Sequence, residues 1–98
     1  MEAARYDLIF RTPLGAKRGS VSFEPAADGT LAATVTAMGK SQTAQGTCEG
    51  NAFAFTGTTT TPLGTTEYEV TGTADGTSLA ALCKTRKGDF KVTGKRVN

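Results

Sequence analysis

Hydrophobic and polar residues alternate along most of the chain, as they do in β-strands with one buried face. In the first such segment Tyr6, Leu8 and Phe10 share a face, and Asp7 and Ile9 lie on the other. The same alternation gives inward-facing sets in later segments: Val21 and Phe23; Leu31, Ala33, Val35 and Ala37; Phe53 and Phe55; Tyr68 and Val70; Phe90 and Val92. No window has the 3.6-residue period of an amphipathic helix. We therefore expect an all-β fold.

Glycines in turn contexts separate these segments. Seven of them, spaced 10–14 residues apart, divide the chain into eight: Gly15, Gly29, Gly39, Gly50, Gly64, Gly76 and Gly88. Such short spacings leave no room for the crossover helices that parallel strands require, so neighbouring strands are expected to pair antiparallel. Closing the sheet would remove both exposed edges. We predict a single domain, residues 1–98, forming an eight-stranded antiparallel up-and-down meander barrel. The alternative is two four-stranded sheets packed face to face.

Two segments have a weaker pattern. The stretch SQTAQGTC, residues 41–48, contains few large hydrophobic residues. In the seventh segment, Leu79, Ala81 and Cys83 are predicted to face inward, which leaves Leu82 outside. A β-bulge is the expected solution there.

Two motifs recur in the chain. TPLG begins at Thr12 and again 49 residues later at Thr61, and ADGT recurs after 47 residues. Proline at the second position and glycine at the fourth suit a tight turn. The recurrence predicts two four-stranded half-repeats, at about residues 5–50 and 52–98, with the TPLG turns facing each other across one rim.

The amino-acid composition favours β-strands, and the cysteines and hydrophobic runs bear on where the protein is located. Hydrophobic residues make up 38% of the chain, and eighteen threonines and twelve glycines compensate. Threonine packs well on a pleated surface. Cys48 and Cys83 have no metal-site or disulfide-framework spacing, so we expect them to be reduced, buried small side chains. The absence of a signal-peptide pattern and of an apolar run of about 20 residues predicts a cytoplasmic protein with no membrane partner.

The net charge of +2 is small, but its distribution is uneven. In a meander, alternate turns lie at opposite ends of the barrel. One rim then carries a basic set, opposed mainly by Asp89 and Glu67: Arg11, Lys17, Arg18, Lys40, Lys84, Arg86 and Lys87. The other carries an acidic set, with Arg5, Lys95 and Arg96 near the termini: Glu2, Glu24, Asp28, Glu49 and Asp75. A basic rim raises the local concentration of anions, although surface lysines also simply keep loops soluble.

Strand alternation also names a candidate ligand site inside the basic rim. The predicted lining residues are Phe10, Gly19, Ala37, Gln42, Gly57, Tyr68, Cys83 and Phe90, with Arg18, Lys40, Arg86 and Lys87 as rim cations. Small residues would leave space, and aromatic residues would supply apolar walls. The expected ligand is a small amphipathic anion, with no cofactor. An eight-stranded barrel can equally be filled by its own side chains, so both interiors remain open.

Catalytic chemistry has no support in the sequence. The chain has no histidine, no nucleophile–base motif, no phosphate-binding loop and no dinucleotide fingerprint. The inward aromatic residues argue against nucleic acid, which a β-surface binds through exposed rings among basic residues. We therefore predict a non-catalytic binding barrel. The alternative is a structural or accessory module that acts through homo-oligomerisation or association with an enzyme, for which Ile9 offers an exposed apolar contact.

The order of motifs resembles a known family. The sequences TPLG, DG, GNAFAF, TPLG, YEVTG, DG and GDFKVTGKR follow one another along essentially the whole chain. This order resembles a family of small bacterial proteins and appended domains of uncharacterised function. In form the chain is also similar to the calycin group of lipocalin, fatty-acid-binding and avidin-type barrels, many of which bind small apolar ligands inside. It contains no Trp, hence no lipocalin G-x-W motif and no avidin tryptophans, and no segment encodes a helical lid. The resemblance therefore implies a shape and transfers no binding residue.

Overall fold

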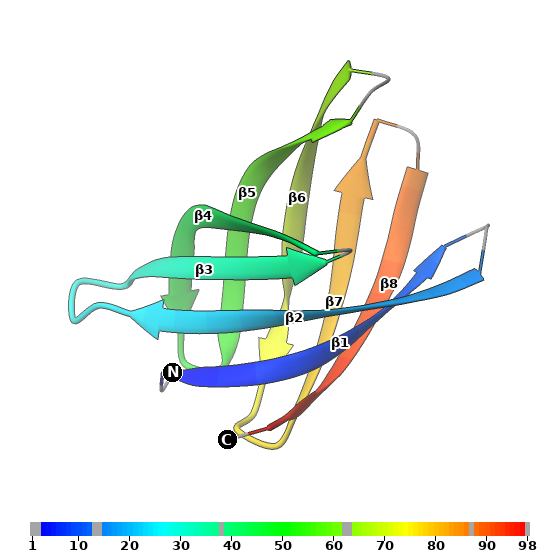
Figure 1. The fold of residues 1–98 in the computed structure, drawn as a ribbon. Helices are drawn as coiled ribbons and strands as arrows, with labels where there is room; N and C mark the ends of the chain where they lie inside the picture. Colours follow the sequence, from blue (N-terminus) through cyan, green and yellow to red (C-terminus); the bar gives the residue numbers. More distant parts are fainter. Residues whose placement is uncertain (1–2, 13–14, 38, 62–63, 87, 98) are drawn as a thin grey trace.

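A closed barrel of eight antiparallel strands forms the whole fold of this computed structural model (Figure 1). The structure describes residues 3–12, 15–37, 39–61, 64–86 and 88–97. The strands are β1 Ala4–Thr12, β2 Gly15–Pro25, β3 Thr30–Ala37, β4 Lys40–Glu49, β5 Ala52–Thr61, β6 Gly64–Ala74, β7 Ser78–Thr85 and β8 Gly88–Arg96. Each strand pairs with the next, and β8 returns to pair with β1. Within the described ranges no helix is long and apolar enough to cross a membrane.

This topology confirms the predicted meander barrel and excludes two separate sheets. Short hairpins produce it because glycine accepts the positive φ that tight turns need. Six of the seven predicted turn glycines have a positive φ: Gly15, Gly29, Gly39, Gly50, Gly76 and Gly88. Pro13 and Pro62 lie outside the described residues, and the two half-repeats remain a prediction.

The prediction of a bulge in the seventh segment is wrong. β7 pairs with β6 from Tyr68–Thr85 to Ala74–Leu79 and with β8 along its whole length, without a break in register. Leu82 needs no bulge because it lies half-buried on the outer wall, opposite Thr71 of β6. The weak segment at residues 41–48 does form a strand, with Ala44 buried.

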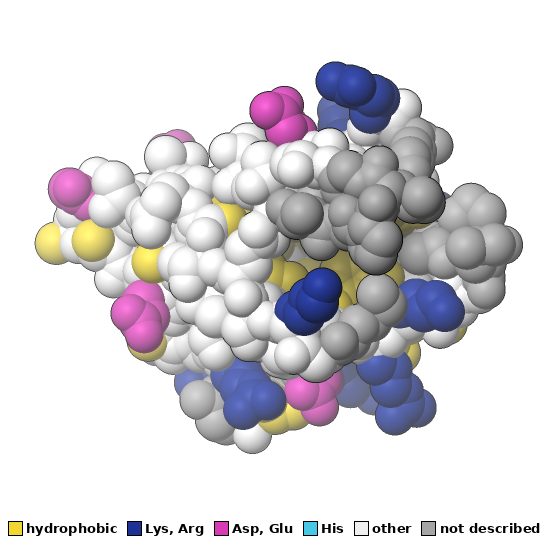
Figure 2. All heavy atoms as spheres, turned by 45° about the horizontal axis from the view of Figure 1, so that its top comes forward, with side chains coloured by type: hydrophobic (Ala, Val, Ile, Leu, Met, Phe, Trp, Pro, Cys, Tyr) yellow, Lys and Arg dark blue, Asp and Glu magenta, His cyan; other side chains and the backbone are white. Residues whose placement is uncertain are grey.

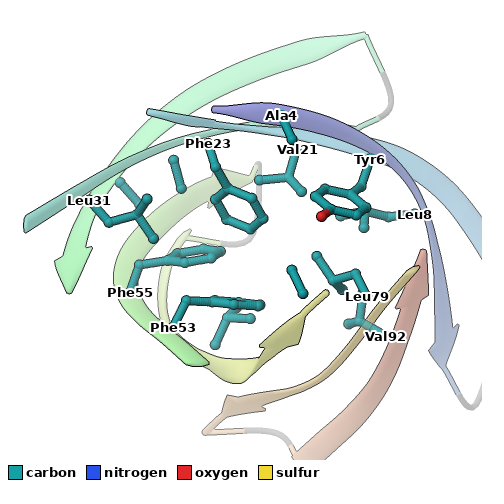
Figure 3. Close-up of a cluster of buried hydrophobic side chains, with 14 residues drawn as sticks. Ala4, Tyr6, Leu8, Val21, Phe23, Leu31, Phe53, Phe55, Leu79 and Val92 are labelled. Atoms are coloured by element: carbon teal, nitrogen blue, oxygen red, sulfur yellow. The ribbon is translucent and has the colours of Figure 1, made fainter. Parts of the chain in front are cut away.

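The core is concentrated at one end of the barrel. Phe23 is 1% exposed and stands at its centre, with ring centroids 4.9 Å from Phe53 and 6.4 Å from Phe55. Tyr6 meets Phe23 edge-on at 5.9 Å. Figure 3 shows these rings converging inside the barrel, together with the aliphatic side chain of Leu31. Rings in such edge-on and tilted contacts add stabilisation beyond the burial of their area.

Backbone hydrogen bonds close the same end. Cys48 N donates to Gly29 O at 2.9 Å, so the β2–β3 turn is tied to β4. Ala74 N donates to the carbonyl of the β4–β5 turn at 2.9 Å, and Arg96 N donates to the carbonyl of Thr77 in the β6–β7 turn at 2.9 Å. The amide of Gly76, in that last turn, donates to Tyr6 Oη at 3.1 Å. Each turn at this end, which we call the closed end, is therefore joined to a neighbouring strand.

Candidate ligand-binding cavity

A cavity of about 580 Å³ occupies the other half of the barrel and opens at the end that carries the β1–β2, β3–β4, β5–β6 and β7–β8 turns. We call this the open end. All eight strands contribute to its wall. The apolar lining residues are Leu8, Phe10, Val21, Phe23, Val35, Ala37, Phe53, Phe55, Val70, Leu79, Ala81, Cys83 and Val92. Figure 2, turned toward this end, shows hydrophobic side chains inside a hollow with Lys and Arg side chains nearby.

The floor of the cavity is the packed aromatic cluster. Phe23, Phe53 and Phe55 belong both to the core and to the lining. Their rings are held by contact with each other, and among the described residues no charged side chain is buried. An apolar ligand resting on this floor would displace water from a surface that forms no hydrogen bonds to it.

Polar lining residues are few and lie on two strands. Lys40, Ser41 and Gln42 begin β4, and Tyr68 lies on β6. Lys40 and Gln42 are exposed, which places them at the mouth. Ser41 Oγ lies 2.8 Å from Thr36 Oγ1, so a hydrogen bond inside the β3–β4 hairpin holds it. The site thus combines an apolar interior with one cation and several hydrogen-bonding groups at its entrance.

Two glycines create room for the aromatic side chains at the mouth. A Cβ on Gly19 would lie 2.8 Å from Phe10 Cε2, and a Cβ on Gly57 would lie 2.5 Å from Tyr68 Oη. Real Cβ atoms do not approach so closely. Gly57 and Tyr68 are direct cross-strand partners, so the phenol ring covers the bare backbone of its neighbour. These glycines therefore let Phe10 and Tyr68 lie against the wall and leave the centre open.

Two titratable groups lie in the wall. Burial raises the pKa of the Tyr68 phenol, and the neighbouring Cys83 raises it further. Burial also raises the pKa of the Cys83 thiol, to which the Asp89 carboxylate contributes. Both groups are therefore neutral near pH 7. Cys83 and Cys48 are free thiols, half-buried rather than fully buried as expected from the sequence.

The structure brings most of the predicted lining residues together. Phe10, Ala37, Gln42, Tyr68 and Cys83 line the cavity. Gly19 and Gly57 lie behind aromatic rings, as described above. Phe90 is half-buried opposite Cys83 but is not part of the lining.

The predicted rim cations do not lie together around the mouth of the cavity. Lys40 lines the cavity. Arg18 pairs with Ile9 on the outward-facing register and is exposed, so it lies on the outer wall. Arg86 is exposed in the β7–β8 turn and borders a different hollow, and Lys87 lies outside the described residues.

That second hollow has a polar lining. It has a volume of about 910 Å³ and lies along the open-end portions of β5, β6 and β7. Its lining is dominated by threonine hydroxyls, with Glu67, Glu69, Lys84 and Arg86. Charges of both signs line it, so it has no preference for anions. Across the described ranges, no three His, Cys, Asp or Glu side chains are grouped as a metal site requires.

The sequence-based site omitted ten lining residues that alternation had placed inward without assigning them to the site: Leu8, Val21, Phe23, Val35, Phe53, Phe55, Val70, Leu79, Ala81 and Val92. Ser41 is the lining residue that alternation placed on the wrong face. Alternation places it outward, on the same face as Thr43, yet it borders the cavity. The cause lies in the strand pairing around β4, which the alternation of residues does not encode.

Comparisons with known proteins support the fold and assign no family or function. No protein-family model matches the chain, and no curated protein matches it. Among solved structures, a redesigned β-barrel is similar to this chain, with a TM-score of 0.69 and 19% sequence identity over 98% of this chain and 91% of that chain. At this identity the likeness concerns the eight-stranded barrel architecture alone.

Proposed function

We propose that this protein is a non-catalytic binding barrel that takes up one small amphipathic anion at its open end. The observation that carries the proposal is an apolar cavity of about 580 Å³ whose polar groups are confined to the entrance. Small-molecule sites have volumes of roughly 300–1,000 Å³ and combine apolar walls with a few placed polar groups. This cavity has both properties.

The apolar interior supplies most of the expected affinity. Each CH₂ group transferred from water to such an interior contributes about 0.8 kcal/mol. The floor formed by Phe23, Phe53 and Phe55 is rigid because the rings pack on each other, so little ordering is required on binding. An aliphatic or aromatic tail is therefore the part of the ligand that the barrel holds.

The entrance selects the charge of the polar end. Lys40 is the charged residue in the described lining, and Ser41, Gln42 and Tyr68 add hydrogen-bonding groups. Because Lys40 is exposed, its attraction for an anion is screened and modest. The resemblance to calycin-type barrels, many of which hold apolar ligands inside, supports the same function, as does the half-repeat interpretation, in which the two halves close around one space.

The test is isothermal titration of three ligands with the same tail and different polar ends: dodecanoate, dodecanol and dodecyltrimethylammonium, each below its micelle-forming concentration. We expect dodecanoate to bind with a 1:1 stoichiometry and at least threefold more tightly than the cation. Lys40→Gln should abolish this preference. Lys95→Gln, at an exposed position near the closed end, should retain it.

A failure of all three ligands to bind would overturn the proposal. Equal binding of anion and cation to the wild-type protein would overturn the charge preference while leaving the apolar site.

A further inference from the structure

The wall of the barrel is open along one seam. β4 pairs with β5 from Gln45–Thr56 to Glu49–Ala52. Beyond that point both strands continue toward the open end without pairing to each other: residues 40–44 pair with β3, and residues 57–61 pair with β6. Figure 1 shows the two strands diverging, as β4 follows β3 and β5 follows β6. We call this gap the β4–β5 slit.

The slit differs from two other seams that, like it, are not joined by a turn at the open end. The pairing of β2 with β3 reaches Ala37, where β3 ends, and the pairing of β6 with β7 reaches Thr85, where β7 ends. At those seams one strand simply extends past its shorter neighbour. Between β4 and β5, five residues on each side continue past the last pair. Alternate residues on each side therefore direct N–H and C=O groups into the gap.

The cavity reaches this slit. Three cavity-lining residues lie on the part of β4 that pairs with β3 but not with β5: Lys40, Ser41 and Gln42. Ser41 is on the outward-facing register, and on the side away from β3 it has no paired strand beside it. On the other side of the slit stands Gly57, which has no side chain to close the gap, and its partner Tyr68 covers its inner face.

We propose that the β4–β5 slit is a lateral portal: the tail of the bound amphiphile lies in the cavity, and its polar end leaves sideways through the slit beside Ser41. This inference rests on the proposed function and specifies the ligand class. The segments that form the slit, KSQTA and GTTTT, contain one cation and no acidic residue, which favours an anionic or neutral polar end. Because that end lies outside the wall, an unbranched chain attached to a bulky group is accepted.

Affinity labelling tests where the polar end lies. The protein is prepared with Cys48→Ala and Cys83→Ala, and a single cysteine is introduced as Ser41→Cys at the slit or Lys17→Cys as the matched control. Both positions are exposed, and Lys17 lies on β2 opposite Phe10, at the rim away from the slit. The probe is N-dodecyl iodoacetamide. The cysteine thiolate attacks the CH₂–I carbon, a C–S bond forms, iodide leaves, and the thiol proton passes to solvent.

Each labelling rate is divided by the rate with iodoacetamide itself, which removes differences in thiol reactivity. We expect this ratio to be at least tenfold higher for Ser41→Cys than for Lys17→Cys, and excess dodecanoate should remove the enhancement. Equal ratios in a protein that binds dodecanoate would overturn the portal and leave the proposed function intact. Absence of dodecanoate binding to the unmodified protein would overturn both.

Discussion

The two ends of this barrel are built from the same strands but joined in different ways. At the closed end, backbone hydrogen bonds tie each turn to a neighbouring strand, and Phe23 packs at the centre of an aromatic cluster. At the open end, hydrogen bonds hold hairpins internally: Thr85 Oγ1 donates to Gly88 O at 2.8 Å within the β7–β8 hairpin. Toward the open end, the β4–β5 pairing stops at Gln45–Thr56, and five residues of each strand extend beyond it.

This difference separates stability from binding. The closed end holds the packed aromatic rings, so we expect it to supply most of the folding free energy. The open end retains space and unpaired strand edges, which cost stability and, under the proposed function, form the binding site. Substitutions at the closed end should therefore change mainly the free energy of unfolding, and substitutions at the open end should change mainly the affinity for the ligand.

The largest effect is expected from Phe23→Ala. Phe23 is 1% exposed and contacts the rings of Tyr6, Phe53 and Phe55, so its removal leaves an apolar void. Substitutions of this kind cost about 3–5 kcal/mol. The measurement is chemical denaturation followed by circular dichroism. The control is Phe10→Ala at the open end, which should cost less than half as much because Phe10 is half-exposed; equal losses would contradict the division between the ends.

Ala81→Phe should remove binding with little change in stability. Ala81 lines the cavity, so a larger ring at this position would extend into the open space. We expect at least a tenfold loss of dodecanoate affinity by titration, with an unfolding free energy within about 1.5 kcal/mol of the wild-type value, in the lower part of the range of about 1–3 kcal/mol that is typical of overpacking. The control is Ala80→Phe on the outer wall, which should bind normally. Retained binding in Ala81→Phe would place the ligand elsewhere.

Cys83 reports on occupancy of the cavity. Its raised pKa leaves little thiolate at pH 7, and the thiolate is the reactive form. In a Cys48→Ala background, we expect Cys83 to react with a disulfide reagent several-fold more slowly than free cysteine, with a rate still rising above pH 9. Saturating dodecanoate should slow the reaction at least a further fivefold. A rate equal to that of free cysteine, or one insensitive to dodecanoate, would contradict the lining assignment.

The smallest effect concerns the pH dependence of the closed end. The amides of Ser78 and Thr77 donate to Asp75 Oδ1 at 2.7 and 2.8 Å and hold the pKa of its carboxyl below the usual value. Since the folded-state pKa lies below the unfolded value of about 3.9, this stabilisation is complete above that value and is lost as the pH falls through the folded-state pKa.

Asp75→Asn should therefore lower the denaturation midpoint slightly at pH 7, and the difference between the two proteins should shrink as the pH falls below the unfolded-state pKa of about 3.9. Glu49→Gln, an exposed carboxylate at the same end, serves as the control. A difference between wild type and Asp75→Asn that stays constant down to pH 2 would rule out the carboxylate as its source.

Much of the fold could be predicted from the sequence because turn glycines and alternation are local signals. Positive φ at Gly39 and Gly88 marks the ends of strands, and the inward set from Tyr6 to Val92 follows from period two. The expected bulge near Leu82 was wrong because a half-buried leucine on the outer wall needs no correction of register.

The candidate site was harder to predict. Alternation identifies which side chains point inward, but not whether they fill the interior, and that depends on where Phe23 and its neighbours gather along the barrel axis. It also cannot show that β4 before Gln45 and β5 after Thr56 are not paired with each other, since pairing depends on both strands and on their other partners. Ser41 was missed for this reason, and Arg18 was included although it lies on the outer wall.

Methyl NMR during a dodecanoate titration tests the central claim most directly. The methyl groups of Val35, Val70 and Val92 line the cavity, Leu31 is buried outside the lining, and Ile9 is exposed on the outer wall. We predict saturable 1:1 shifts of the three valines, with Leu31 and Ile9 nearly unchanged. Shifts confined to Ile9 and other surface methyls, or no shifts at all, would contradict a barrel with one packed end and one open end.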